Sequence, residues 1–145
     1  MEIEQITHLP PQMAALEKEA VAEGFRFLTR LISDWNSGAT RFDAPGECLM
    51  AAYLSQQLVG IGGMSVDPFT PIRTGRLRHM YVTPTSRGQQ VGRRLINALL
   101  AHASMHFESV RLYTDTFGGT AFYLRCGFAR TEDAQATHIV QLRKL

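Results

Sequence analysis

One segment constrains the fold of this chain more than any other. It is a long amphipathic pattern that follows a strand and a glycine-containing turn. Apolar residues recur every four positions from Val91 to Phe107, which predicts a helix with one face against a core. The residues from Arg76 to Thr83 predict the preceding strand, and Pro84 ends it.

Other patterns add strands and helices on both sides of this segment. The remaining predicted strands are residues 2–7, 49–54, 58–64, 109–115 and 137–143. The short turn at 55–57 favours a hairpin. Two helices are predicted between Pro10 and Gly38, divided at Gly24, and a short one covers 121–125. This order predicts a mixed α/β fold.

Length and composition limit the classes of protein. The 145 residues predict one domain, 1–145, and 45% hydrophobic with 19% charged residues is an ordinary globular composition. No apolar run approaches the ~20 residues of a membrane span, and residues 1–5 do not begin a secretory signal. Cys48 and Cys126 are too few for a disulfide framework or a four-thiolate zinc site. We therefore expect a cytoplasmic protein with reduced thiols and no membrane partner.

The charge distribution is uneven, although the net charge is only +2. Residues 68–107 contain no acid but hold six arginines, Arg73, Arg76, Arg78, Arg87, Arg93 and Arg94. Such a segment is either a solvated surface or a field that collects an anion. The modest excess of basic residues and the absence of aromatic–basic alternation argue against nucleic acid. A small polyphosphate fits better.

The turn before the long helix has the properties of a phosphate-binding site. The first N–H groups of a helix have no internal partner and lie at the positive end of its dipole. Gly88 and Gly92 would let a ligand approach closely, while Arg87, Arg93 and Arg94 add mobile positive charge. An ordinary strand–helix turn with surface arginines is the alternative. The turn is not a Walker loop, because no Gly-Lys-Ser/Thr follows, and it is not a dinucleotide fingerprint, because the glycine spacing is wrong and the strand lies mid-chain.

Two segments resemble the GNAT superfamily of acetyl-CoA-dependent N-acetyltransferases. Residues 87–92 (Arg-Gly-Gln-Gln-Val-Gly) resemble its Arg/Gln-x-x-Gly-x-Gly/Ala pyrophosphate motif, and 77–84 resemble the strand that runs into it. Residues 121–128 (Ala-Phe-Tyr-Leu-Arg-Cys-Gly-Phe) resemble the helix and turn whose tyrosine serves as general acid. The resemblance covers residues 49–128. Gln90 stands in place of a motif glycine. Either a helical backbone tolerates the glutamine, or its side chain crowds the pyrophosphate and weakens cofactor binding.

The resemblance implies a fold and an activity. The fold is a central mixed, mostly antiparallel sheet of six or seven strands flanked by about four helices. The activity is acetyl transfer from acetyl-CoA to a primary amine of a small molecule, by direct attack and without a metal. The implied cofactor-binding residues are Met80, Tyr81, Val82, Arg87, Gly88, Gln89, Gln90, Val91, Gly92 and Arg93. Tyr123 would be the general acid, the alternative being a core tyrosine packed beside Phe122 and Phe128.

The general base and the acceptor stay open. His79, Glu47 or water could take the proton of the amine, although a strand histidine and a surface carboxylate are equally ordinary features. In the family's layout, the loop at residues 35–47 would line the acceptor pocket. Its acids, with Asp34 and Asp67, would attract a cationic amine, whereas Arg41 would favour a carboxylate.

Two readings from other classes compete with the enzyme. A non-catalytic acyl-CoA-binding sensor or regulatory module would need neither Tyr123 nor an open acceptor pocket. A nucleotide-phosphate binding domain would need a metal-ligating residue in the phosphate loop, and Ser86 is the only hydroxyl close by. His102 and His106 are four residues apart, but no third zinc ligand is evident. The sequence leaves the oligomeric state open, with a homodimer among the alternatives.

Overall fold

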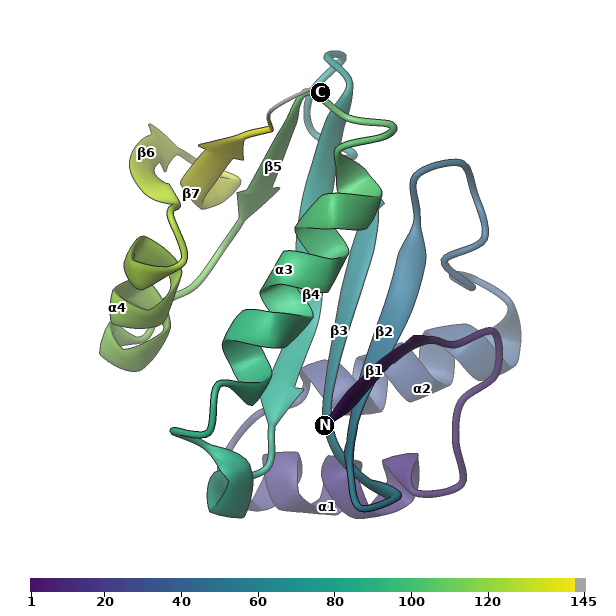
Figure 1. Cartoon of the computed structure of the whole chain (residues 1–145). Helices are drawn as coiled ribbons and strands as arrows, with labels where there is room; N and C mark the ends of the chain where they lie inside the picture. Colours follow the sequence, from purple (N-terminus) through teal and green to yellow (C-terminus); the bar gives the residue numbers. More distant parts are fainter. Residues whose placement is uncertain (143–145) are drawn as a thin grey trace.

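A computed structural model describes residues 1–142 of the chain (Figure 1). The strands are β1 (Glu2–Gln5), β2 (Cys48–Leu54), β3 (Gln57–Val66), β4 (Thr74–Val82), β5 (Ser109–Leu112), β6 (Ala129–Asp133) and β7 (Ala136–Gln141). The helices are α1 (Met13–Ala22), α2 (Phe27–Ser37), α3 (Val91–Ala103) and α4 (Phe117–Arg125), with a 3-10 turn, η1, at Pro84–Ser86.

The strands form one seven-stranded sheet in the order β1-β2-β3-β4-β5-β7-β6. Every neighbouring pair is antiparallel except β4 and β5, which run parallel. A parallel pair needs a crossover connection, and α3 supplies it. This arrangement confirms the expected mixed, mostly antiparallel sheet with about four helices.

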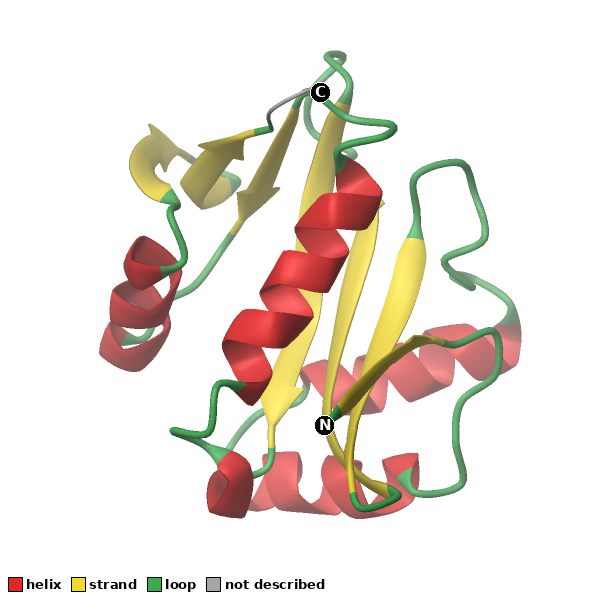
Figure 2. Cartoon of the chain, in the orientation of Figure 1, coloured by secondary structure: helices red, strands yellow, loops and turns green. Residues whose placement is uncertain are grey.

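Helices cover both faces of the sheet, as Figure 2 shows. On one face, the apolar stripe of α3 (Val91, Leu95, Ile96, Leu99 and Ala103) is buried against β2, β3 and β4. Side chains of α4 pack at the margin of that cluster. On the other face, Leu16, Leu28, Leu31 and Trp35 of α1 and α2 form a second buried cluster. The sheet therefore has two apolar faces at its centre.

Strands β4 and β5 separate after a short parallel contact. Their pairing covers only Thr74–Arg76 of β4, against Ser109–Arg111 of β5. Figure 1 shows β5 turning away from β4 beyond this point. Within the described residues 1–142, the rest of β4, Leu77–Val82, is paired only on its β3 side. The fold thus leaves half of a central strand with an open edge, and α3 begins beside that edge.

The structure differs from several predicted elements; the predicted strands 2–7 and 109–115, for example, end at Gln5 and Leu112. Strand β6 was not expected, because residues 129–133 are nearly all exposed and have no apolar alternation. Helix α4 begins at Phe117 rather than 121, since the Thr116 hydroxyl caps it despite Gly118 and Gly119, which are poor helix formers. Helix α3 ends at Ala103, although Phe107 is still buried in the core.

The last predicted strand, 137–143, corresponds to β7, and its end at residue 143 lies outside the described residues. Within residues 1–142, none of the helices combines the length and apolar character that a membrane crossing requires.

Candidate active site

The turn between β4 and α3 presents a run of unpaired backbone amides. None of the N–H groups of residues 88–93 donates to a protein acceptor within residues 1–142. Gly88 has a left-handed backbone, with φ +81°, and open space beside its Cα. Arg93 and Arg94 have no carboxylate within 4.0 Å in the same part of the chain. Unpaired amides at a helix N-terminus, with free cations beside them, can hold a phosphate group.

Gln90 does not have the helical backbone that we expected. It is the N-cap of α3 and its φ is +68°, in the left-handed region. This conformation explains why the family places glycine here, since left-handed backbone costs a side-chain-bearing residue roughly 1–2 kcal/mol. With Gly88 also left-handed, the turn has the alternating backbone of an anion-binding nest.

Gly92 adjoins protein rather than open space. A Cβ at this position would lie 3.0 Å from Cζ of Phe122, on α4. The glycine therefore lets α4 approach the first turn of α3. Its side-chain-free surface is used for packing, while its amide remains in the unpaired run.

Arg87 is held by α1, which contradicts the expectation of a mobile side chain. Its Nη1 and Nη2 donate to the Glu23 carboxylate at 3.0 and 2.8 Å, and its Nε donates to the Val82 carbonyl at 3.0 Å. Tyr81 donates from its hydroxyl to the same carboxylate at 2.6 Å. The Arg87 and Tyr81 hydrogen bonds lower the pKa of Glu23. Arg87 thus fixes the start of the turn.

The backbone of Val82 faces the open edge of β4. The Thr83 N–H donates to the Val59 carbonyl, which makes Thr83 and Tyr81 the hydrogen-bonded positions of the ladder and Val82, opposite Gly60, a position without hydrogen bonds to β3. In an antiparallel ladder such a residue directs its N–H and C=O groups away from that partner. Val82 therefore lies where we expected cofactor contacts, and Met80, which belongs to the β-bulge, is two residues before it on β4. Tyr81 does not face the open edge, because its backbone pairs with Ile61 and its side chain is buried under α1.

A β-bulge in β4 places His79. Gly62 alone lies between the paired residues Ile61 and Gly63 of β3, whereas His79 and Met80 both lie between their partners on β4. His79 has a left-handed backbone, with φ +61°, and its ring packs edge-on against Phe42 at 5.9 Å. Burial, with the nearby Arg78 charge, lowers the pKa of His79 to about 4, so the ring is neutral at pH 7.

Tyr123 lies on α4 among aromatic rings. Its ring centroid is 5.2 Å from that of Phe122, 5.7 Å from Phe128 and 6.3 Å from His138. Burial raises the pKa of the Tyr123 phenol, so the group keeps its proton well into the alkaline range. No hydrogen bond joins its hydroxyl to another group in residues 1–142. Packing and a proton-donor role are both compatible with this position.

Glu47 lines a cavity of about 310 Å³ on the α1–α2 side of the molecule. The loop after α2 supplies most of the wall, including Arg41 and Asp43, and Arg78 reaches it from β4. The two carboxylate oxygens of Glu47 accept the N–H groups of Ala44 and Val66 at 3.4 and 3.0 Å. This cavity is where the acceptor pocket was expected.

Asp67 was expected as an exposed acid that attracts an amine, and this expectation is wrong. Its side chain is fully buried, 3.6 Å from Arg76 and 3.4 Å from Arg111. Arg111 also pairs with Asp133 at 3.0 Å. These ion pairs join β3, β4, β5 and β6 at the point where β4 and β5 separate, so Asp67 is a structural anchor. Asp34 does not line the cavity either.

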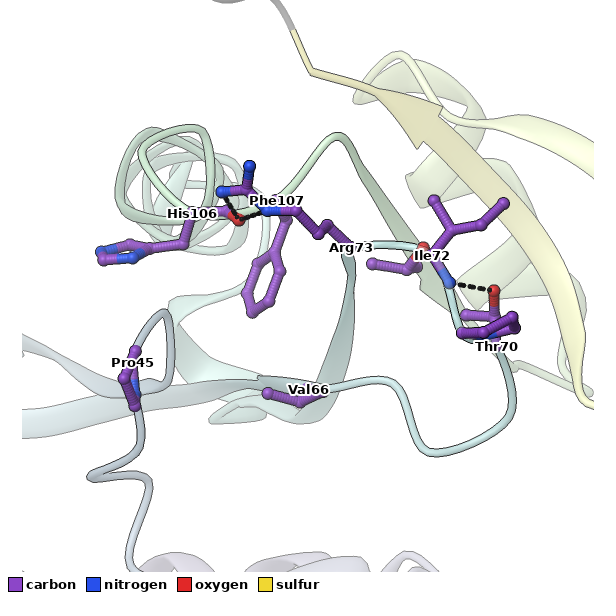
Figure 3. Close-up of a pocket in the computed structure, with 9 residues that line it drawn as sticks. Pro45, Val66, Thr70, Ile72, Arg73, His106 and Phe107 are labelled. Atoms are coloured by element: carbon purple, nitrogen blue, oxygen red, sulfur yellow. Dashed lines mark hydrogen bonds between the residues drawn. The ribbon is translucent and has the colours of Figure 1, made fainter.

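Figure 3 shows a neighbouring cavity of about 390 Å³, beside the end of α3. Arg73 donates to the His106 carbonyl there, from Nε at 3.1 Å and from Nη2 at 2.6 Å. None of the predicted site residues lines this cavity. Within residues 1–142, no three His, Cys, Asp or Glu side chains are grouped closely enough to hold a metal ion.

The comparison with known families agrees with this geometry. The model of the acetyltransferase (GNAT) domain matches residues 45–130, more than half of the chain and the whole segment from β2 to α4. The chain belongs to the GNAT acetyltransferase family. This confirms the family expected from the two motifs, and with it the enzyme class of acyltransferase.

Individual relatives support the same family. An IAA acetyltransferase of Azospirillum brasilense is 34% identical over 83 residues, a match that spans 55% of this chain and 53% of that protein. The structure of a protein from Exiguobacterium sp. 255-15 described as an acetyltransferase has a TM-score of 0.87 at 25% identity, with 97% and 92% of the two chains covered. An aminoglycoside 6'-acetyltransferase type Ii shares the fold, at TM-score 0.72 and 18% identity over 100% and 99%.

Sequence reasoning missed three residues of this GNAT site. Glu23 holds Arg87 and Tyr81 from 64 and 58 positions away, and nothing in the local sequence indicates such a partner. Phe42 covers His79 from a loop that has no periodicity. Arg78 was noted only as part of a basic segment. The β-bulge that places His79 on the same face as Arg78 has no sequence pattern of its own.

Proposed function

We propose that the protein transfers an acetyl group from acetyl-CoA to a primary amine of a small molecule. The observation that carries this proposal is the run of unpaired amides at residues 88–93, beside the open edge of β4. An aminoglycoside 6'-N-acetyltransferase of the same fold, at 18% identity, has been crystallised with coenzyme A. When bound, acetyl-CoA would supply the acetyl group as a thioester.

The residues present fit that co-substrate. The amides of residues 88–93 would bind the pyrophosphate, and Arg93 and Arg94 would add positive charge from the first turn of α3. The open space at Gly88 leaves room for the phosphates. The N–H and C=O groups of Met80 and Val82 would bind the pantetheine amides as an added strand.

Two proton transfers remain for the side chains. Tyr123 would donate its phenolic proton to the departing thiolate as the carbon–sulfur bond breaks, since the phenol is protonated at neutral pH. Glu47, which lines the acceptor cavity, would take up the proton of the attacking amine through water. His79 is the alternative base; it is neutral at pH 7, but its lowered pKa makes it a weaker base than an ordinary imidazole.

A binding series and a turnover assay test the proposal separately. CoA should bind with higher affinity than pantetheine, which lacks the pyrophosphate, and added salt should weaken CoA binding because exposed phosphate contacts are screened. Equal affinities for CoA and pantetheine would remove the amide run from the site. A screen of primary amines with acetyl-CoA, read as release of free thiol, tests turnover. CoA binding without thiol release for any amine would favour a sensor.

A further inference from the structure

The cavity that Glu47 lines has an unusual balance of charge. It has a volume of about 310 Å³, at the small end for ligand sites, and two arginines and two acids lie in its wall. The proposed function places the acceptor amine on this side of β4. The charges of the wall therefore bear on which amines can enter.

Strand alternation places Arg78 in the cavity wall, and the β-bulge places His79 on the same face. Leu77 packs under α3, whereas Arg78 lines the cavity on the opposite face. His79 follows directly and contacts Phe42, which belongs to the cluster under α1 and α2. Two consecutive residues thus lie on one face, which is what an extra residue in a strand produces. Arg78 therefore lines the cavity from the strand that we propose binds the pantetheine arm.

Neither guanidinium group in the wall forms an ion pair within residues 1–142, whereas the Glu47 carboxylate in the same wall already accepts hydrogen bonds. Neither Arg78 nor Arg41 lies within 4.0 Å of a carboxylate in residues 1–142, whereas Arg76 and Arg111, nearby on the sheet, are paired with acids. Only Nε of Arg41 is used, to donate to the Trp35 carbonyl at 2.9 Å. Both Glu47 oxygens already accept backbone N–H groups.

A buried hydroxyl group in the same wall also has no partner. Ser65 is 4% exposed, and its Oγ has no hydrogen-bond partner within residues 1–142. Buried polar groups are almost always hydrogen-bonded. With Arg78 alongside, Ser65 adds a potential donor to an acceptor-binding surface.

We propose that the acceptor carries a carboxylate as well as its amine, and that Arg78 binds this carboxylate with Arg41 at the rim. A guanidinium offers a planar pair of N–H donors that matches a carboxylate. Asp43 and Glu47 in the same wall oppose a doubly charged phosphate, so a zwitterion such as an amino acid fits the balanced charge best. A polycationic amine is disfavoured by the two free arginines. This inference rests on the proposed function.

Matched acceptors test the carboxylate directly. An amino acid, its carboxamide and its decarboxylated amine share one side chain and one reacting amine. The assay uses the natural protein and saturating acetyl-CoA. We expect kcat/KM for the amino acid to exceed that for the other two acceptors by at least about tenfold, because those acceptors would leave the Arg78 guanidinium without a carboxylate partner. An aminoglycoside should be a poorer substrate than the amino acid. Equal rates for the three matched acceptors would overturn the inference and leave the proposed function intact.

Arg78→Gln identifies the residue responsible. It should raise KM for the amino acid about tenfold or more and abolish the preference over the carboxamide, while KM for acetyl-CoA stays unchanged. Arg73→Gln is the control, because it removes the same charge from the neighbouring cavity and should leave both KM values within about twofold. An Arg78→Gln enzyme that keeps the natural preference would show that Arg78 does not bind the carboxylate.

A binding measurement separates this inference from the proposed function. Calorimetric titration of the N-acetyl amino acid and of its carboxamide, in the presence of CoA, requires no turnover. Stronger binding of the carboxylate form, reduced in Arg78→Gln, supports the inference even for a protein that releases no thiol. Equal binding of the two forms overturns it.

Discussion

Tyr123 shows how one side chain can serve both packing and chemistry. Its ring contacts Phe122 and Phe128 in edge-on geometry, and its hydroxyl has no partner in residues 1–142. Aromatic pairs of this kind contribute about 0.5–1.5 kcal/mol to stability through the ring alone. The hydroxyl is therefore the part of this residue that the fold does not need.

Tyr123→Phe should keep the fold and lose the chemistry. We expect the single-turnover rate to fall by roughly 100-fold or more, because the proton is needed only as the carbon–sulfur bond breaks. Affinity for acetyl-CoA and the unfolding midpoint should stay close to those of the natural protein. The measurement uses single-turnover conditions with saturating acceptor, so that product release does not limit the rate. A rate within threefold of the natural enzyme would show that water, and not Tyr123, protonates the departing thiolate.

Gln90→Gly should stabilise the protein rather than destabilise it. With φ at +68°, glycine relieves a left-handed backbone, and we expect the free energy of unfolding to rise by about 0.5–1 kcal/mol. CoA affinity should change little, because the amide stays in place. Urea denaturation and CoA titration provide the readouts.

Gln89→Gly is the control for this change, since Gln89 is the neighbouring residue and does not have a positive φ. Glycine there adds freedom to the unfolded chain and removes the hydrogen bond that the Gln89 side chain donates to the Thr85 carbonyl, so the free energy of unfolding should fall by about 0.4–1 kcal/mol or more. The same sign for both variants would contradict the assigned backbone. A large gain in CoA affinity for Gln90→Gly would instead show that the glutamine crowds the pyrophosphate.

At the level of secondary-structure elements, the turn between β4 and α3 is held in place by a residue from the opposite face of the sheet. Glu23, just after α1, accepts hydrogen bonds from Arg87 at the start of the turn and from Tyr81 of β4. This contact orders the chain immediately before Gly88. The helix α1 thus helps to fix a turn that lies beside α3.

Glu23→Gln should loosen this contact. The pair is partly exposed, so we expect the free energy of unfolding to fall by only about 0.5–1 kcal/mol. CoA affinity should fall as well, because the ligand must then order the turn. Glu17→Gln, on α1 and without an ion pair in residues 1–142, is the matched control. Equal CoA affinity in both variants would show that the turn orders itself.

At the scale of the whole molecule, the buried histidine of β4 links stability to pH. Burial lowers the pKa of His79 from 6.5 to about 4. Between these values the unfolded chain binds a proton that the folded chain does not bind. The free energy of unfolding should therefore fall as the pH drops from about 6.5 to 4.

His79→Asn tests this linkage, because asparagine tolerates the left-handed backbone at this position. The natural protein should lose about 2–3 kcal/mol of unfolding free energy through this histidine between pH 7 and 4.5, and the variant should lack that loss. Other acids and His138 titrate in both proteins, so the difference between the two pH profiles is the readout. Parallel profiles would mean that the His79 ring is accessible to water.

The parts of this GNAT domain that depend on near neighbours could be predicted from the sequence. The apolar stripe of α3 and the strand before it follow from local periodicity and backbone preferences, and they predicted the mixed sheet that the structure confirms. The family came from the resemblance of residues 87–92 and 121–128 to two known motifs, and the family match confirms it.

The lining of the candidate site could not be predicted from the sequence, because it depends on contacts between distant segments. The bulge that directs Arg78 and His79 to one face arises from pairing between β3 and β4, and the Glu23–Arg87 contact joins residues 64 positions apart. Burial of Asp67 likewise depends on arginines from two other strands. Contacts of this kind depend on which distant segments the fold brings together, and no local pattern in the sequence encodes them.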